Sequence, residues 1–396
     1  MTISSGTVKV GKNINSGTGT VTITGGTVTT GENIGGTGSV TVSGGTVDTH
    51  NITANTLAVT NGKVTAETGI KGGTLNVSGG TLTASGENEK AAINSDVTIS
   101  GGSVTANGGS TAAGLAATME KPVKNVTISG GMVIATGGTG NGLSGAGIGA
   151  GNKEAGGKVT ISGGKVVAKG GDYAAGIGGA GMESADVIIT GGSVKASSIG
   201  GGGAYGGAGG GSLTDGKGNS VTLKTFTLQD SSGSPVTDTA IDAFTIPTYG
   251  IKDVRTDTEG KLYFYLPNSI TDGTPVTVTA DSTGYEGSVS GSATLKPFAG
   301  DIDLSQGSGN LYIWGDGYMR GGSANESAKK TYTGDYTLTG GTAESATANT
   351  VTVMGDYNGN PVSGTEKTIT LNGVNIDVNS QSYACAFSIQ AGTGAG

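Results

Sequence analysis

The phrase VTISGG occurs at residues 126–131, and close variants of it recur along the first half of the chain. Aligning on the first member of each Gly-Gly pair, or its equivalent, gives nine repeats between Ser5 and Gly191. In every repeat, apolar residues lie four and two positions before that member and three positions after it. A chain with this pattern must bury the same three positions in each repeat.

The spacing within the repeats indicates β-structure. Apolar residues two positions apart alternate as in a strand, whereas a helix would place them three and four apart, and Gly, Thr and Val are poor helix formers. A further ladder of Ile or Leu, from Ile14 to Ile177, precedes the repeats, so each repeat supplies about three short strands. We therefore predict an all-β chain in which residues 1–213 form a right-handed parallel β-solenoid (β-helix) of about nine coils.

Two sets of structural residues follow from this alignment. The ladder residues, predicted to stack inside from coil to coil, are Ile23, Val28, Val42, Val47, Ile99, Val104, Ile128, Val133, Ile161, Val166, Ile189 and Val194. The corner residues, predicted at the turn between two ladders because glycine tolerates positive φ, are Gly25, Gly44, Gly79, Gly101, Gly130, Gly163 and Gly191. Three glycine-rich insertions, at 137–151, 170–182 and 200–211, either add closely packed strands or form binding loops.

From residue 214 the repeat stops, and short strands separated by turn clusters follow. With the motifs DSSGSPV (230–236) and TDTEGKLYFYLP (256–267), residues 219–297 resemble the carboxypeptidase-regulatory or Cna-B-like β-sandwich. The resemblance implies an Ig-like spacer module. In crosslinked relatives a first-strand Lys joins a last-strand Asn; Lys224 takes the place of that Lys, but the closing strand has no Asn, so no crosslink is expected.

Residues 298–396 are predicted to form an aromatic cap and the first coil of a second β-solenoid. The phrase ITLNGVNIDV (369–378) repeats the solenoid pattern, and the following SYACAFSIQ is expected to bury Cys385 or Phe387. Five aromatic residues precede this phrase: Tyr312, Trp314, Tyr318, Tyr332 and Tyr336. They either plug the end of a core or form a platform for sugar rings, because both roles use large amphipathic rings.

The whole chain resembles Gly-rich parallel β-helix repeat proteins of Gram-positive, gut-type bacterial cell surfaces, of the type described as carbohydrate-binding domain-containing. The likeness is carried by the ISGG phrases, by AGIGAG (146–151) and AGIGGAG (175–181), and by YGIKDVRTDTEGKLYFYLP (249–267). It implies an extracellular or cell-surface location and association with polysaccharide or cell-wall glycan. No export signal is expected at Met1, which strand-like sequence follows directly.

Composition narrows the functional classes. The net charge is −8, which is unlike a nucleic-acid-binding surface, and no apolar run reaches the length of a membrane span. The single cysteine excludes a disulfide framework or a cysteine metal cluster. Acidic residues of the first half occupy unrelated repeat positions, so we expect no enzyme, no catalytic residue and no metal site. No cofactor is expected either, and calcium lacks a supporting motif because the G-G-x-G-x-D repeat is absent.

The pattern favours a non-enzymatic extracellular rod, acting as a stalk, adhesin or fibre segment of a bacterial cell surface. The alternative is a polysaccharide-binding β-helix module assisted by calcium. Met1 falls at a ladder position and the second solenoid contains about one coil, so the rod is expected either to continue in a longer chain or to stack end to end with further copies. The sandwich and the aromatic segment are expected to cover the internal end of the first solenoid.

Overall fold

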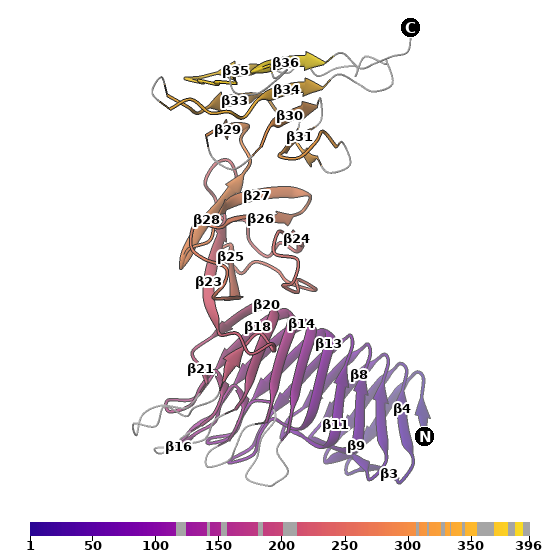
Figure 1. Cartoon of the computed structure of the whole chain (residues 1–396). Helices are drawn as coiled ribbons and strands as arrows, with labels where there is room; N and C mark the ends of the chain where they lie inside the picture. The colour runs from indigo at the N-terminus through magenta and orange to yellow at the C-terminus, as the bar shows by residue number, and fades with distance from the viewer. Residues whose placement is uncertain are drawn as a thin grey trace. The chain divides into compact units, whose positions relative to one another are not determined.

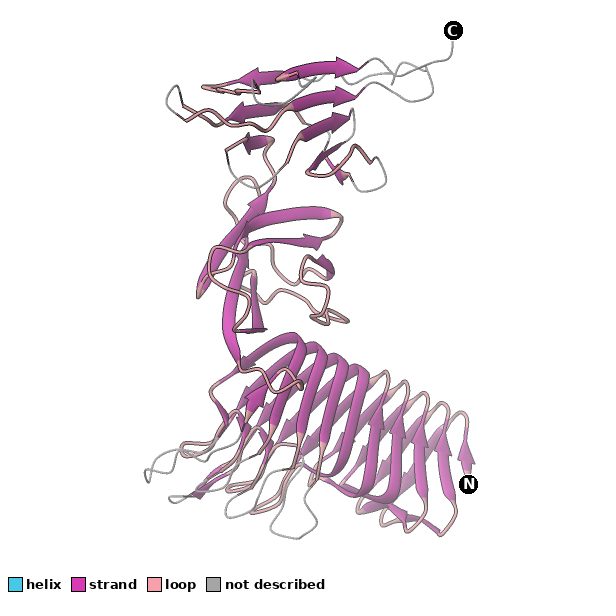
Figure 2. Cartoon of the chain, viewed as in Figure 1, coloured by secondary structure: helices cyan, strands magenta, loops and turns pink. Residues whose placement is uncertain are grey.

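The chain is built from β-strands and divides into two compact units, residues 1–297 and 298–396. The computed structural model describes residues 1–115, 124–140, 143–151, 157–180, 185–200, 212–305, 309–314, 317–325, 329–332, 334–342, 345–354, 368–378 and 385–390. These residues contain no helix (Figure 2). The prediction of an all-β chain is therefore confirmed for the described residues.

Seventeen strands of the repeat region (residues 1–213 with the adjoining Thr214) form one parallel sheet, whose successive strands are stacked in Figure 1. Strands that end before the glycine pair are β1 (Thr2–Ile3), β4 (Thr20–Ile23), β7 (Ser39–Val42), β9 (Asn51–Val59) and β11 (Ile70–Val77). Strands that follow the pair are β2 (Thr7–Val10), β5 (Thr27–Thr30), β8 (Thr46–Thr49), β10 (Lys63–Ala66) and β12 (Thr81–Ser85). Four strands run through the pair without a break: β13 (Ile93–Asn107), β14 (Val126–Thr136), β18 (Val159–Lys169) and β20 (Val187–Ala196). The remaining members are β3 (Ile14–Gly17), β6 (Asn33–Gly36) and β22 (Leu213–Thr214).

The register of this sheet advances by one repeat from strand to strand. Ile99 pairs with Ile128, Ile128 with Ile161, and Ile161 with Ile189. Each predicted ladder residue is at most 1% exposed and belongs to one continuous apolar core. Because burying one such aliphatic side chain contributes about 1.5–3 kcal/mol, the stacked ladders are the main stabilising element of the region.

A second parallel row continues the third ladder. Leu115 bridges Ile93 and Ile148, and the row then passes through β17 (Ile148–Gly149), β19 (Ile177–Gly178) and β21 (Ile199–Gly200). The described part of the first glycine-rich insertion packs against this row, with Ala146 and Ala150 fully buried and a short hairpin of β15 (Thr139–Gly140) and β16 (Leu143–Ser144). Most of the insertion at 200–211, including Tyr205, lies outside the described residues.

Residues 221–297 form a six-stranded sheet in the order β24-β26-β27-β28-β23-β25. Its strands are β23 (Val221–Leu228), β24 (Ile241–Phe244), β25 (Lys261–Pro267), β26 (Pro275–Ala280), β27 (Thr283–Ser288) and β28 (Ser292–Pro297). Phe226, Phe244, Tyr249 and Phe264 pack ring against ring in its core, with centroids 4.9–6.1 Å apart. Val221 and Tyr265 instead join the apolar core of the repeat region, so residues of this module cover part of that core.

The second unit contains two parallel ladders. One comprises β29 (Asp301–Asp303), β33 (Tyr336–Thr339) and β35 (Ile369–Leu371); the other comprises β30 (Leu311–Trp314), β34 (Val351–Met354) and β36 (Phe387–Gln390). An antiparallel extension adds β31 (Gly317–Arg320) and β32 (Lys330–Thr331). Repeat-like pairing therefore begins at Asp301, well before the predicted start at Ile369.

The last segment also settles the choice between Cys385 and Phe387. Phe387 packs against the apolar core of the second unit, whereas Cys385 is exposed. Leu371, which pairs with the buried Leu338, is itself 54% exposed.

Candidate functional sites

The corner of each repeat depends on two different properties of glycine. Positive φ values of 69–85° fall on the second glycine of the pair, at Gly26, Gly45, Gly62, Gly80, Gly102, Gly131, Gly164 and Gly192. The first glycine, at which the corner was expected, has ordinary φ but faces the preceding repeat; a Cβ at Gly101 would lie 2.6 Å from the carbonyl oxygen of Ser78. The expectation is thus corrected by one residue, and Asn61 is tolerated because Gly62 carries the positive φ.

Residues 249–257, here called the clasp, lie across the glycine pairs of successive repeats. The second glycine of three repeats donates its N–H to this segment: Gly192 to the Gly250 carbonyl at 2.7 Å, Gly164 to the Lys252 carbonyl at 2.6 Å, and Gly131 to Asp253 Oδ2 at 2.9 Å. Lys252 Nζ donates to the carbonyl of Ser100, in the repeat that precedes these three, at 2.6 Å. Four consecutive repeats are therefore joined by one segment of the module that contains the six-stranded sheet.

The first glycines of the same pairs leave room for the clasp. A Cβ at Gly130 would meet Asp253 Oδ2 at 2.6 Å, and a Cβ at Gly191 would meet the Cα of Gly250 at 2.6 Å. These glycines thus permit both close packing of successive repeats and the approach of the clasp from later in the same chain.

Tyr249 fixes the N-terminal end of the clasp. Its hydroxyl donates to the carbonyl of Gly192 at 2.8 Å and accepts from the N–H of Tyr265 at 3.1 Å. Complete burial raises the pKa of Tyr249 far above its ordinary value, since the phenolate would lose its hydration.

An ion pair supports the other end of the clasp. Lys195 Nζ lies 3.5 Å from Asp257 Oδ2 and 5.0 Å from the centre of the Tyr263 ring, and the Tyr263 hydroxyl donates to Asp257 at 2.9 Å. The hydrogen bond with Tyr263 raises the pKa of Lys195. The pKa of Asp257 lies below its ordinary value. Burial alone would raise this pKa, but hydrogen bonds from the backbone amides of Lys261 and Glu259 stabilise the carboxylate and outweigh the effect of burial. This arrangement connects β20, which contains Lys195, to the segment that contains the clasp.

The five predicted platform aromatics separate into two groups. Tyr318, Tyr332 and Tyr336 cluster around Phe298, which stacks on Tyr318 at 4.6 Å and meets Tyr332 edge to face at 4.8 Å. Tyr312 and Trp314 form a separate pair with centroids 6.3 Å apart. Trp314, Tyr318 and Tyr336 are at most 7% exposed, so their rings belong to the core of the second unit and do not offer an open face.

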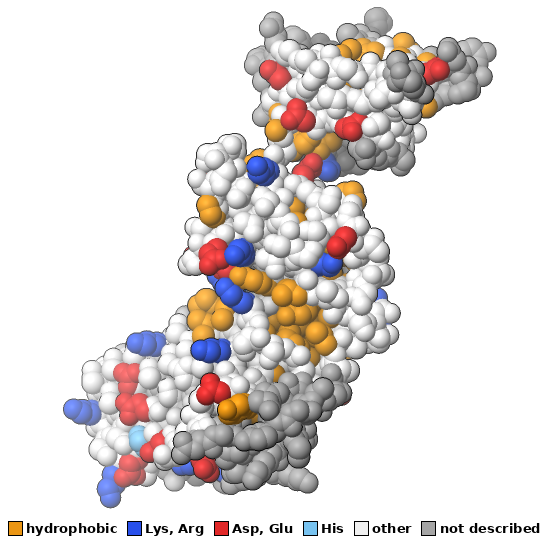
Figure 3. Space-filling view, turned by 90° about the vertical axis from the view of Figure 1, so that its left-hand side faces the viewer, with side chains coloured by type: hydrophobic (Ala, Val, Ile, Leu, Met, Phe, Trp, Pro, Cys, Tyr) orange, Lys and Arg blue, Asp and Glu red, His pale blue; other side chains and the backbone are white. Residues whose placement is uncertain are grey.

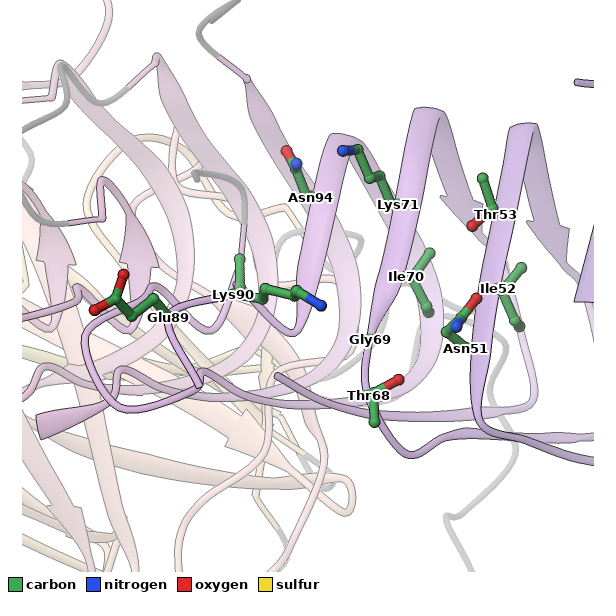
Figure 4. A pocket seen from close by; sticks show the side chains of 11 residues that line it. Asn51, Ile52, Thr53, Thr68, Gly69, Ile70, Lys71, Glu89, Lys90 and Asn94 are labelled. Atoms are coloured by element: carbon green, nitrogen blue, oxygen red, sulfur yellow. The ribbon is translucent and has the colours of Figure 1, made fainter. Parts of the chain in front are cut away.

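A polar trough lies on the repeat region between the third ladder and the strands that follow it. It consists of two adjoining cavities of about 380 Å³ each, which share the side chains of Thr53, Lys71 and Asn94. These three residues are register neighbours on β9, β11 and β13, and Figure 4 shows them in a row above Ile52 and Ile70. Asn51, Thr68 and Lys90 line the other side of the first cavity.

Two local features form the walls of this trough. On β11, Gly72 and Gly73 bulge relative to β13, whose pairing jumps from Lys71–Asn94 to Thr74–Asp96. The second wall is the Glu89–Ala91 turn between β12 and β13. This site was not predicted from the sequence. The only sequence signal for it is the longer repeat at this point: the spacing is 18 residues from Asn61 to Gly79 but 22 residues from Gly79 to Gly101.

The described residues hold no group of three or more His, Cys, Asp or Glu side chains arranged for a metal ion.

His50 Nδ1 lies 3.7 Å from Glu67 Oε2 at the surface. Lys224 forms an ion pair with Asp272 at 2.6 Å. Both signs of charge are interspersed over the face drawn in Figure 3.

Within the described ranges, no helix is long and apolar enough to cross a membrane. In the comparisons with known proteins, no family model, curated protein or solved structure matches this chain.

Proposed function

We propose that this chain is a non-enzymatic structural and adhesive rod of a bacterial cell surface. In this proposal residues 1–213 are a right-handed parallel β-solenoid of nine coils, and residues 219–297 are a spacer module that braces its later coils. The observation that carries the proposal is the unbroken parallel register of equivalent residues from Ile3–Ile23 to Ile161–Ile189. Such pairing makes stability a sum over neighbouring coils and suits a load-bearing or spacing element.

The clasp adds a second supporting argument. A solenoid held only by neighbour contacts can open at any coil, whereas the clasp ties the coils of Ser100, Gly131, Gly164 and Gly192 to one segment. Local opening of any one of these coils then also breaks its contact with the sandwich.

Electron microscopy and an activity screen test the rod. Nine coils at a strand spacing of about 4.8 Å predict a rigid element roughly 40 Å long within the purified chain. We expect filaments or longer rods where copies or further repeats join end to end. Compact round particles, or cleavage of a polysaccharide by the purified chain, would contradict the proposal.

Polysaccharide binding is the second candidate function, and the trough is the observation that favours it. The trough offers amides, hydroxyls and ammonium groups along adjacent strands, whereas the predicted aromatic platform is largely buried. A glycan array screened with and without a calcium chelator tests this function. Saturable binding supports it, loss of that binding with chelator supports the calcium-assisted form, and silence across all glycans contradicts it.

A further inference from the structure

We propose that the two glycine pairs next to the clasp, Gly79–Gly80 and Gly101–Gly102, form a docking site for an extended, acidic peptide segment of a partner protein. The clasp shows what such a segment must offer, because it already occupies the equivalent pairs of the three following repeats. This inference goes beyond the proposed rod, and it requires neither polysaccharide binding nor filament formation.

Two backbone donors at this site lack the partner that their equivalents have. The second glycines Gly80 and Gly102 have φ of 69° and 75°, close to the 79–85° of Gly131, Gly164 and Gly192. The latter three are buried and donate to the clasp, whereas Gly80 and Gly102 are partly exposed and donate to no acceptor among the described residues. Because buried backbone N–H groups are nearly always paired, a segment that covered these two glycines would have to supply acceptors, as the clasp does.

The surface above these two pairs is open. Among the described residues, a Cβ at Gly79 would meet only the carbonyl group of Thr60 within 4 Å, and the three atoms nearest to a Cβ at Gly101 all belong to Ser78. Both neighbours lie in the preceding repeat. At Gly130, by contrast, the atom nearest to a Cβ belongs to the clasp. An extended chain can therefore approach the two open pairs as closely as the clasp approaches the later ones.

The site has a defined end on each side. On one side, Lys252 of the clasp reaches the carbonyl of Ser100 at 2.6 Å. On the other, Asn61 replaces the first glycine in the repeat before Gly79, and its exposed side chain stands where a docked chain would pass. At about 4.8 Å between neighbouring strands and about 3.3 Å per extended residue, three or four residues of a peptide are enough to contact both open pairs.

An apolar flank lies beside the donors. Met132 and Ile134 are 40% and 37% exposed, and Met132 pairs in register with Ser103, the residue that follows the second open pair. Two repeats later, Ser193 occupies the position of Met132 and accepts a hydrogen bond from the backbone of β25 at 3.1 Å. The strand surface that β25 covers there is thus uncovered at Met132 and Ile134, where an apolar side chain of a docked peptide can pack.

The acceptors of the clasp indicate which peptide fits. Gly250 and Lys252 use backbone carbonyls, which every peptide offers, and Asp253 uses its carboxylate, 2.9 Å from the N–H of Gly131. Gly131 is the covered donor in the repeat next to Gly102. A hydrogen bond from a backbone N–H to a carboxylate is roughly twice as strong as one between neutral groups. A peptide with an acidic side chain is therefore favoured, and it would bind as an added extended segment.

A capped synthetic peptide, YGIADVATD, tests the proposal with the full chain. It is the clasp sequence with alanine in place of Lys252 and Arg255, so that two carboxylates are its only charges. Hydrogen–deuterium exchange should become slower in the segments that contain Gly80 and Gly102, and should stay unchanged around Gly164, where the clasp remains bound. In fluorescence anisotropy, the peptide with alanine in place of its first Asp should bind about tenfold more weakly.

A pair of charge variants supplies the matched comparison. Thr81→Glu/Ser103→Glu places carboxylates directly after the two open pairs, where they repel the acidic peptide, and should weaken binding at least about tenfold. The control, Asn76→Glu/Thr98→Glu, adds the same charge to the same two repeats at register neighbours on the other side of the pairs. Its binding should be nearly that of the wild type.

Three results would overturn the inference. The first is unchanged exchange at Gly80 and Gly102, or equal binding by Thr81→Glu/Ser103→Glu and its control. The second is tighter binding of the peptide by Tyr249→Phe, because a peptide that displaced the clasp would gain from a weakened clasp. The third is self-association of the chain in sedimentation that Thr81→Glu/Ser103→Glu abolishes, which would make a second copy the occupant. Each result leaves the rod and polysaccharide binding to their own tests by microscopy and glycan array.

Discussion

The hydroxyl of Tyr249 donates a hydrogen bond to the carbonyl oxygen of Gly192 at 2.8 Å, across 57 residues of sequence. The hydroxyl oxygen of Tyr249 also accepts from the N–H of Tyr265 at 3.1 Å, so this one buried atom joins a glycine pair, the clasp and β25. Buried polar groups that lose such partners cost more than the bonds themselves contribute.

Replacing Tyr249 by Phe should therefore destabilise the unit formed by residues 1–297. The variant leaves the Gly192 carbonyl and the Tyr265 N–H without this partner. Each loss should lower the free energy of unfolding by about 1–3 kcal/mol. Urea denaturation measures the loss, and Tyr173→Phe, at a side chain that is 36% exposed, is the control. Equal stability of the Tyr249→Phe variant and the wild type would show that the clasp contributes nothing.

Alkaline pH should weaken the same unit. Burial raises the folded-state pKa of Tyr249, so this group binds its proton more tightly in the native than in the unfolded chain. Its stabilisation is complete below the unfolded pKa of about 10 and is lost as pH rises above it, by up to about 1.4 kcal/mol per pH unit. The free energy of unfolding, measured by urea denaturation from pH 9 to 11.5, should fall less steeply for Tyr249→Phe than for the wild type. Parallel curves would assign the alkaline loss to other groups.

Replacing Trp314 by Ala should destabilise the second unit. The side chain is 7% exposed, and truncating a buried aromatic costs about 3–5 kcal/mol. Tyr312→Ala, at the more exposed partner of the same pair, is the control and should cost less. Thermal melting reports the loss. A folded Trp314→Ala variant that only loses glycan binding would restore the platform interpretation.

The ladders could be predicted from sequence because their signal is local. A V-x-I spacing followed by a glycine pair fixes both strand geometry and inward direction within eight residues, and Ile128 and Val133 are accordingly buried. The second unit contains a variant of the same phrase, YTLTGG at 336–341, in which Tyr336 and Leu338 occupy the ladder positions. Both residues are buried.

The clasp and the trough could not be predicted in this way. The YGIKDVRTD segment carries no repeat signal, and its partners lie at least 57 residues earlier in the chain. The trough arises where a bulge at Gly72 and Gly73 meets a turn lengthened by a few residues. Both depend on how distant segments meet, which a repeat alignment does not contain.

Placing a charge in the ladder should unfold the neighbouring repeats. Ile128 is fully buried and pairs with Ile99 and Ile161, so Ile128→Asp buries a carboxylate without a partner, at a cost of several kcal/mol. The adjacent Thr127 faces solvent on the same strand, and Thr127→Asp should leave the midpoint of thermal melting nearly unchanged. Equal melting of both variants would reject the inward assignment of Ile128.

Replacing the second glycine of two different pairs by alanine should separate the energetic cost of positive φ from the cost of a steric clash with the preceding repeat. Gly6 and Gly131 have nearly the same φ, 78° and 79°, but a Cβ at Gly6 has no atom within 4 Å, whereas one at Gly131 would lie 2.6 Å from the carbonyl oxygen of Gly102. Gly6→Ala should therefore cost only the strain of a left-handed backbone, about 1–2 kcal/mol, and Gly131→Ala should cost that amount plus the strain of moving the preceding repeat. Urea denaturation of both variants measures the difference. A larger cost at Gly6 than at Gly131 would show that close packing of successive repeats is not what requires glycine at the corner.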